Sequence, residues 1–487
     1  MDPSMKIIKP NGITKLMDKI NTLGFLCGFK NIWITEVNLS KRFIKIYNKV
    51  EYVIDLFNLI FTVSIVGSFF TQKSLTETQA SDRLIFTIVF PGHMMLYYVL
   101  LYYKQETRNI LYHLVVVLKE HQNDAALERE MIKKVKVLYF SLAGVIVTVF
   151  VAFGLRALYQ VVNAGDNFIT LIPAWPDVHD PSTAAGFMRV GFYLWWLPVA
   201  GKFMYAYLIL LTTMLAVCYQ FRNLQIYFYN LEDIFGDKTL SQEEKEVKYE
   251  QAFKLGIQMH SLTLWCKKQH QRTSQEMFAI EILLFVSMLL TQLKSILGEE
   301  RNLTHLVTIA MMTMGGCLSL GLFMWSGGDI TVEAAKLSEA MYSSGWENCY
   351  GQSSVRIRKL VVNAMRQAQE PVVYKTFGIV EFSYEAYVSV STYLGTSQNV
   401  DRLTKKNTHW IINRLYYSMS ISRAIFFFLL CILLSIAICL KHLAILMDEL
   451  CLGIYFDEHE ESSIDHSHGS IGNRFIRFGT LFLLSLE

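Results

Sequence analysis

The chain has 487 residues, of which 52% are hydrophobic and 18% are charged, and its formal net charge is +3. Globular proteins average about a quarter charged residues, so this composition favours a membrane protein, and the small, dispersed positive charge argues against a nucleic-acid partner. None of the eight cysteines belongs to a CxxC pair, which argues against a disulfide framework or a zinc site. The sequence carries no glycine-rich phosphate loop, HExxH or GxSxG, so we predict neither an enzyme nor a bound cofactor.

Long apolar runs follow one another along the chain. A helix needs about 20 mostly apolar residues to cross a bilayer core. Six runs meet this criterion clearly: 52–70, 84–103, 135–158, 190–219, 277–297 and 303–325. A seventh, 377–394, is aromatic and hydroxyl-rich and contains Glu381 and Glu385, and an eighth, 424–447, is strongly apolar. We predict an all-α polytopic membrane protein with seven transmembrane helices and an atypical additional C-terminal apolar helix.

The basic residues predict the topology. Residues 1–48, 104–136, 222–276 and 326–376 contain 8, 7, 8 and 6 Lys and Arg residues. The loops that alternate with them are counted with two each: Lys73 and Arg83, Arg156 and Arg189, and Lys294 and Arg301. The positive-inside rule then places the N-terminus in the cytoplasm, which is the reverse of a G-protein-coupled receptor. The cytoplasmic stretches 246–277 and 330–349 keep a helical spacing of apolar residues. We therefore expect them to continue the fourth to seventh segments as helices.

The stretch LSEAMYSSGWENCY, residues 337–350, is predicted to be an amphipathic helix. Its small residues permit close backbone approach, and Tyr342 and Trp346 lie four positions apart on one helical face. Two interpretations remain at this point. The helix joins subunits through an aromatic contact, or it lies on the membrane surface.

Three stretches together resemble the C-terminal third of insect odorant receptors: GGDITVEAAKLSEAMYSSGWENC, IRKLVVNAMRQAQEPVV and FSYEAYVSVS. The residues that carry the resemblance are Gly327, Gly328, Tyr342, Ser344, Trp346, Met365, Arg366, Gln369, Pro371, Ser389 and Val390. The predicted outer loop LIPAWPDVHD, residues 171–180, is similar to the family's Pro-x-x-Trp-x-Pro loop.

The resemblance implies a tetrameric ligand-gated cation channel in the plasma membrane of olfactory neuron dendrites, where a receptor subunit assembles with a common co-receptor. It implies a cytoplasmic segment at 1–48, six transmembrane segments with an outer-half ligand pocket at 49–325, anchor helices at 326–376 and a pore-lining segment at 377–400. The anchor residues carried over from the family pattern are Tyr342, Trp346, Met365, Arg366 and Pro371.

A volatile, mostly apolar ligand needs a dry aromatic and aliphatic cavity with one or two polar groups. The candidate ligand-binding residues in the predicted outer halves are Phe86, Phe90, His93, Phe150, Phe153, Tyr159, Phe192, Trp195, Trp196, Lys202, Met311, Met312 and Thr313. Packing, or a place in an interfacial aromatic belt, explains many such aromatics equally well.

Two polar candidates have simpler explanations. Lys202 lies in the middle of an apolar run, where a charge is costly and usually functional. It could bind ligand, pair with Asp55, or extend its ammonium group to the membrane surface. His93 follows Pro91 and Gly92, so a packed kink accounts for it without a ligand.

The seventh segment offers hydroxyl groups to hydrated cations at Ser389, Thr392, Tyr393 and Thr396, and Val400 falls where the family has a hydrophobic gate. After Val390 the family pattern ends, and residues 401–487 form an atypical tail whose basic residues would lie outside. We interpret the chain past about residue 390 as a translated intron or a mis-joined exon; a native ending is the alternative. The stretch 457–469, with three histidines and several acids, is expected to be solvated, and a metal site is its other interpretation.

Two other functions remain open. A gustatory receptor has a similar fold, but its Thr-Tyr-hydrophobic-Gln-Phe ending is matched only partly, by Thr392 and Tyr393 followed by Gln398 and Asn399. A secondary transporter predicts inverted repeats, and the sequence shows no repeat.

Overall fold

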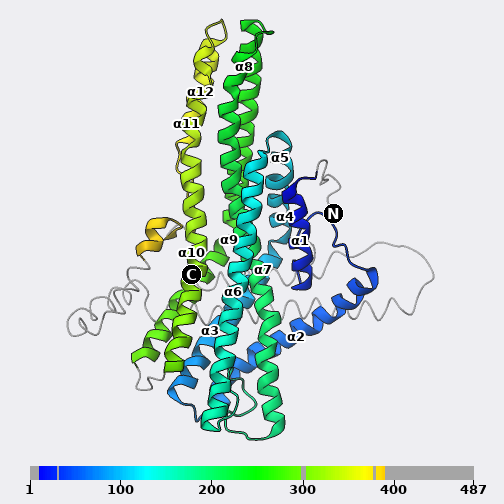
Figure 1. Ribbon diagram of the computed structural model, residues 1–487, viewed down its shortest axis with the longest axis vertical. Coiled ribbons are helices and arrows are strands. Elements are labelled where there is room, and N and C mark those ends of the chain that lie inside the picture. Colours follow the sequence, from blue (N-terminus) through cyan, green and yellow to red (C-terminus); the bar gives the residue numbers. More distant parts are fainter. Residues whose placement is uncertain (1–9, 30–31, 298–302, 377–379, 390–487) are drawn as a thin grey trace, which may run out of the picture. The chain divides into compact units, whose positions relative to one another are not determined.

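The computed structural model of the chain describes residues 10–29, 32–297, 303–376 and 380–389, and helices dominate them (Figure 1). The α-helices are α1 (Gly12–Leu26), α2 (Lys41–Thr71), α3 (Glu77–Tyr102), α4 (Lys104–Tyr112), α5 (Leu118–His121), α6 (Ala125–Ala164), α7 (Thr183–Tyr229), α8 (Asp233–Gly236), α9 (Gln242–Leu297), α10 (Leu303–Ala335), α11 (Leu337–Tyr342) and α12 (Ser354–Ala368). The shorter elements are the π-helix η1 (His113–Val117), the 3₁₀ helices η2 (Asn230–Glu232) and η3 (Trp346–Asn348), and the strands β1 (Lys375–Thr376) and β2 (Val380–Glu381).

Six of the described helices are long and apolar enough to cross a membrane, and they coincide, to within a few residues, with the first six predicted runs. They are α2, α3, α6, α7, α9 and α10. The prediction of an all-α multi-pass membrane protein is confirmed. The predicted helical continuations are also present, because α7, α9 and α10 all extend well beyond their apolar runs.

The apolar helices differ in how far they are covered by protein. In the most apolar window of α7, 83% of the residues are buried, against 17% in α6 and 22% in α2. Helix α7 is therefore the centre of the bundle, and α6 and α2 present apolar side chains outward, as lipid-facing helices do.

Several helix starts follow from their sequence. Thr76 begins α3 with a capping box in which it exchanges hydrogen bonds with Gln79. The carboxylate of Asp124 accepts from the backbone N–H of Ala126 and Leu127 at the start of α6. Such caps satisfy backbone donors that the helix itself leaves free, so they fix where the membrane helices begin.

Helix α1 is buried against α6, which the sequence analysis did not predict. Its Ile13 and Met17 are each 1% exposed. The backbone N–H of Ile13 donates to Oε1 of Glu128 at 3.1 Å, and the Asn11 side chain donates to the carbonyl of Val115 at 3.2 Å. The first helix is thus tied to the part of α6 that precedes its apolar run.

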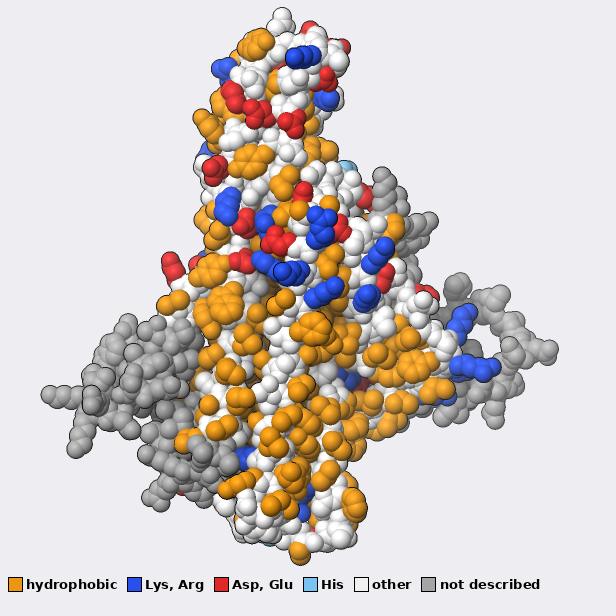
Figure 2. Space-filling view, viewed as in Figure 1, with side chains coloured by type: hydrophobic (Ala, Val, Ile, Leu, Met, Phe, Trp, Pro, Cys, Tyr) orange, Lys and Arg blue, Asp and Glu red, His pale blue; other side chains and the backbone are white. Residues whose placement is uncertain are grey.

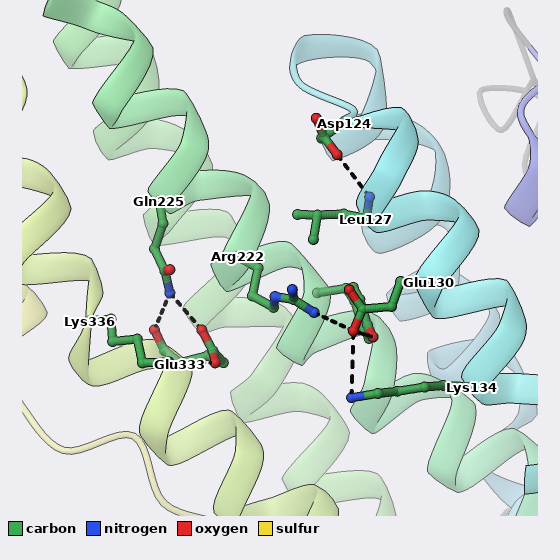
Figure 3. A network of polar contacts seen from close by, with 9 residues as sticks. Asp124, Leu127, Glu130, Lys134, Arg222, Gln225, Glu333 and Lys336 are labelled. Carbon is green, nitrogen blue, oxygen red and sulfur yellow. Dashed lines mark hydrogen bonds and ion pairs between the residues drawn. The ribbon is translucent and has the colours of Figure 1, made fainter.

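We call residues 104–134, 219–276 and 326–371 the charged end. Figure 2 shows Lys, Arg, Asp and Glu gathered on one part of the visible surface, and hydrophobic side chains covering much of the rest. At the charged end, Arg222 of α7 donates to Glu130 of α6 at 2.9 Å, and Gln225 of α7 donates to the carbonyl of Glu333 of α10 at 2.7 Å (Figure 3). The bond from Arg222 holds the pKa of Glu130 below its usual value. Polar contacts therefore join α6, α7 and α10 where their apolar packing ends.

The chain after α12 forms a short antiparallel strand pair, and its second strand lies at the start of the predicted seventh run, where a helix was expected. Lys375 pairs with Glu381 and Thr376 with Val380. Helical structure resumes at residues 384–389. The rest of the predicted seventh segment, and the tail with its apolar run 424–447, lie outside the described residues.

Candidate functional site

Four predicted ligand-binding residues form one aromatic group, which we call the outer cluster: Phe86, Phe150, Phe153 and Trp196. Phe86 of α3 meets Phe153 of α6 edge-on, with ring centres 5.2 Å apart. Trp196 of α7 lies 6.2 Å from Phe86, 5.7 Å from Phe150 and 6.4 Å from Phe153. Three helices therefore bring these four rings together, and edge-to-face and stacked pairs of this kind favour aromatic partners.

A second aromatic group adjoins it through α3 and α7. Phe61 of α2 contacts both Phe90 and Phe192, at 5.0 and 5.1 Å between ring centres. Phe57, one turn earlier on α2, lies 4.3 Å from Trp195. The sequence analysis missed Phe57 and Phe61 because it assigned the first segment no ligand-binding role. Their spacing of four residues on an apolar helix was the signal that could have identified them.

Tyr193 was also missed, and it completes the outer cluster. Its ring stacks on Phe150 with centres 4.1 Å apart, and its hydroxyl donates to the Phe150 carbonyl at 2.8 Å. A Cβ at Gly154 would lie only 2.2 Å from the Tyr193 hydroxyl oxygen. Glycine at position 154 is therefore what allows α7 to place this tyrosine against α6.

The remaining candidates lie outside both aromatic groups. His93 stacks on Phe203 with ring centres 4.1 Å apart, which agrees with the packed kink. Tyr159 is 50% exposed. Met311 and Met312 are half-buried, and the Thr313 hydroxyl lies 2.5 Å from Oε1 of Gln292. A ligand role for these residues stays a prediction.

Lys202 forms an ion pair with Asp55, one of the three roles considered for it. Its side chain is 3% exposed, and its ammonium group lies 4.2 Å from the centre of the Tyr97 ring. The Tyr97 hydroxyl donates to the carbonyl of Gly28 at 3.2 Å. Gly28 has φ +87°, and a Cβ there would lie 2.8 Å from Nζ of Lys202. The lysine thus joins α2, α3 and α7 beside the end of the N-terminal helix.

The loop between α6 and α7 is bound to the end of α2 and to α7 by side chains that donate to its carbonyls. The Gln72 amide donates to Pro176 at 2.9 Å and accepts from the Val178 N–H at 3.2 Å. Arg189 donates to the carbonyls of Asp177 and Asp180 at 2.7 and 2.6 Å. The loop that contains LIPAWPDVHD, which we call the cover loop, is therefore held in place at the end of the bundle opposite the charged end.

The predicted amphipathic helix at 337–350 is shorter than expected. Helix α11 ends at Tyr342, and Gly345 takes a left-handed conformation with φ +84°. A Cβ at Gly345 would lie 2.9 Å from Cα of Glu232. The turn breaks the helix because the chain must pass this close to η2. Tyr342 and Trp346 still meet, with ring centres 6.0 Å apart.

The small residues of this stretch pack within the chain. Ala340 and Ser344 are fully buried, and the Ser344 hydroxyl lies 2.6 Å from the Tyr249 hydroxyl of α9. Tyr342 is 58% exposed, Arg366 and Pro371 are exposed, and Met365 is half-buried. The small residues thus make a buried contact with α9, whereas the predicted anchor residues, with Trp346 also half-buried, are exposed or half-buried.

Hydrogen bonds to two glutamates attach α12 to α9. Glu246 accepts from the backbone N–H of Gly351 at 2.6 Å, and Glu250 accepts from Nε of Arg356 at 3.1 Å. The Arg356 guanidinium and the Lys254 ammonium group lower the pKa of Glu250. The charged end is therefore a folded unit in which the segments before the seventh run are attached to α9.

A sequence model of the 7tm odorant receptor family matches residues 76–393. The chain belongs to this family. The match contains the outer cluster, the cover loop and the anchor residues, and it confirms the resemblance found in the sequence. It favours an odorant receptor over the gustatory receptor and transporter alternatives. No curated protein sequence matches the chain.

Two solved structures of odorant receptors share the fold. The insect olfactory receptor OR5 from Machilis hrabei in complex with eugenol has a TM-score of 0.63 at 13% identity, over 80% of this chain and 99% of that chain. The structure of the same receptor described without eugenol has a TM-score of 0.62 at 13% identity, over 81% and 98%. At this identity the likeness concerns the fold.

Of the pore candidates predicted for this odorant receptor, only Ser389 lies among the described residues. It is exposed, and its hydroxyl donates to the carbonyl of Glu385 at 2.8 Å. Thr392, Tyr393, Thr396 and Val400 lie outside the described residues.

Proposed function

We propose that the chain is an odorant receptor subunit, a cation channel that volatile, mostly apolar ligands open. The match of the family model over residues 76–393 carries this proposal. The relative from Machilis hrabei, solved in complex with eugenol, supports a small organic ligand.

The ligand site is the outer cluster with its neighbours on α2. Phe86, Phe153 and Phe192 are buried, and Trp196 is half-buried between α3 and α6. Aromatic side chains offer large apolar contact areas with specific ring geometry, which suits small ligands that have few polar atoms. In this proposal the cover loop, which is held by Gln72 at the end of α2 and by Arg189 of α7, keeps this region away from water.

The exposed surface of the charged end is the subunit contact. Tyr342, Tyr350, Val355 and Val362 are each between 58% and 74% exposed there. Exposed apolar side chains that gather on one region often mark protein interfaces. In the proposed assembly this surface joins four subunits, including the common co-receptor.

Gating links the two regions. Ligand opens the channel only if it binds the open arrangement more tightly than the closed one. Helix α7 runs without a break from Trp196 to the charged end, and the seventh segment begins within the strand pair, whose Lys375 carbonyl accepts from Gln271 of α9. We place the N-terminus in the cytoplasm, the chain in the plasma membrane of olfactory dendrites, and residues 377–400 around the pore.

Whole-cell recording tests the proposal. The full chain is expressed with the common co-receptor and exposed to a panel of volatiles, and the co-receptor alone is the control. We expect a cation current that requires this chain and depends on ligand concentration. No current beyond the control, from a chain that reaches the cell surface and from one in which the family's usual ending replaces residues 391–487, would contradict it.

A further inference from the structure

A buried ion pair lies between α3 and α6. Arg156 and Asp82 have side chains that are 6% and 8% exposed. Nη2 of Arg156 contacts Oδ2 of Asp82, and Nη1 lies 3.5 Å from Oδ1. Burying a charged group away from water costs several kcal/mol for each ion. Ionisable residues buried in a membrane protein are therefore candidates for function.

The pair adjoins the outer cluster. The guanidinium carbon of Arg156 lies 5.0 Å from the centre of the Phe153 ring. Asp82 precedes Phe86 by one helical turn, about 6 Å along α3, and the Phe86 ring contacts Phe153. The ion pair thus lies at the side of the cluster that is nearer the start of α3 and the cover loop.

Arg156 has one donor that Asp82 does not use. Its Nε–H is buried and has no hydrogen-bond partner among the described residues. A buried donor without a partner is costly, and a guanidinium group can only donate. An oxygen acceptor on a ligand beside Phe153 would satisfy this donor, whereas a hydrocarbon would not.

The charge of the pair restricts the ligand further. Asp82 already balances Arg156, so this pair carries no net charge for an anion to neutralise. A neutral ketone, aldehyde, ester or alcohol presents an acceptor without a charge that must be desolvated. An aliphatic amine, which is protonated at neutral pH, would bring only donors to a group that itself only donates.

We propose that Arg156, oriented by Asp82, is the polar anchor of the ligand site and selects neutral oxygen-containing volatiles over hydrocarbons of the same shape. The proposal rests on the proposed function, because it takes the outer cluster as the ligand site.

Matched ligand pairs test it in binding, independently of gating. Purified full chain is titrated with acetophenone and ethylbenzene, and with octan-2-one and octane, and ligand-induced thermal stabilisation is followed. For the wild type we expect each ketone to reach half-saturation at a concentration at least about 10-fold lower than its matched hydrocarbon, because a hydrogen bond to a charged group has about this strength. We call the quotient of the two half-saturation concentrations, hydrocarbon over ketone, the preference ratio. The double variant Asp82→Leu with Arg156→Met removes the pair without leaving a lone charge. In this double variant the preference ratio should fall to about 1–3, and hydrocarbons should still bind.

Two further variants provide an independent test and a matched control. Arg156→Lys keeps the positive charge but lacks the Nε–H, so it should lose most of the preference even if the double variant folds poorly. Glu130→Leu with Arg222→Met removes a different ion pair, between α6 and α7 at the charged end, and should leave the preference intact.

The outcomes separate the two proposals. Equal binding of ketones and hydrocarbons by the wild type, or an unchanged preference in the folded Arg156 variants, overturns the role of Arg156 alone. Failure of the wild type to bind either class contradicts the proposed function, and the role of Arg156 falls with it.

Discussion

Lys202 of α7 and Asp55 of α2 form an ion pair, and the same ammonium group lies 4.2 Å from the centre of the Tyr97 ring of α3. The pair lies beside Gly28, whose carbonyl accepts from Tyr97. One buried side chain thus connects three membrane helices and the end of the N-terminal helix. The neighbouring acid and ring are sufficient to account for the burial of this charge.

Lys202→Met should destabilise the folded chain by about 2–4 kcal/mol, because it leaves Asp55 without its cationic partner. The melting temperature of the purified protein measures the effect. Lys136→Met is the matched control, since Lys136 is exposed on α6, and it should change little. Lys202→Met with Asp55→Leu should recover most of the loss. A single variant as stable as the control would show that the pair is unimportant.

Gln72→Ala should free the cover loop. The Gln72 side chain is 3% exposed and binds the loop at Pro176 and Val178, so its removal leaves buried polar groups without partners, at about 1–3 kcal/mol each. We expect faster hydrogen exchange in residues 171–180. Gln367→Ala, at an exposed position of α12, is the control. Unchanged exchange in the loop would mean that Gln72 does not hold it.

Gly345→Ala should destabilise the charged end for two reasons, a positive φ and a Cβ placed 2.9 Å from Glu232. Gly165→Ala is the control that isolates the backbone strain, because Gly165 also has a positive φ, +68°, but has nothing within 4 Å of an added Cβ. Backbone strain alone costs about 1 kcal/mol or more, and we expect Gly345→Ala to lower the melting temperature further than Gly165→Ala. Equal effects would mean that the contact with η2 is dispensable.

Hydropathy was enough to locate the first six membrane helices, because a long apolar run identifies such a helix without any knowledge of the residues it packs against. The contacts at the site were harder to predict because their partners are distant in the chain. Arg156 was counted as a loop residue and is buried against Asp82, 74 positions away. The break at Gly345 was missed because it depends on η2, which no local pattern in 337–350 reveals. Four of the candidate ligand residues did meet in one cluster, since aromatic residues in the same half of neighbouring helices have few other places to pack.

The burial of Lys267 should make the stability of the folded chain depend on pH. Burial lowers the pKa of Lys267 to about 8, with the nearby Lys375 acting in the same direction. The folded state therefore loses this proton at lower pH than the unfolded state does. Below pH 8 both states carry it and the penalty is complete; as pH rises from 8 towards the ordinary lysine value, folding becomes more favourable.

The measurement is the difference in melting temperature between wild type and Lys267→Met from pH 7 to 9.5. The wild type should gain relative to the variant as pH rises, because other groups titrate equally in both. A difference that stays constant, or that moves in favour of the variant, would contradict the lowered pKa.

The central claim is that volatile ligands act at the outer cluster, and ligand concentration–response curves for Trp196→Leu test it most directly. Currents are recorded with the co-receptor and compared with those of Trp265→Leu, which changes a tryptophan at the charged end. At equal surface expression, the half-maximal concentration should rise at least about 10-fold for Trp196→Leu, since a lost aromatic contact of this size costs about 1.5 kcal/mol. The control should match the wild type. Identical curves for all three chains would place the ligand elsewhere and contradict the account.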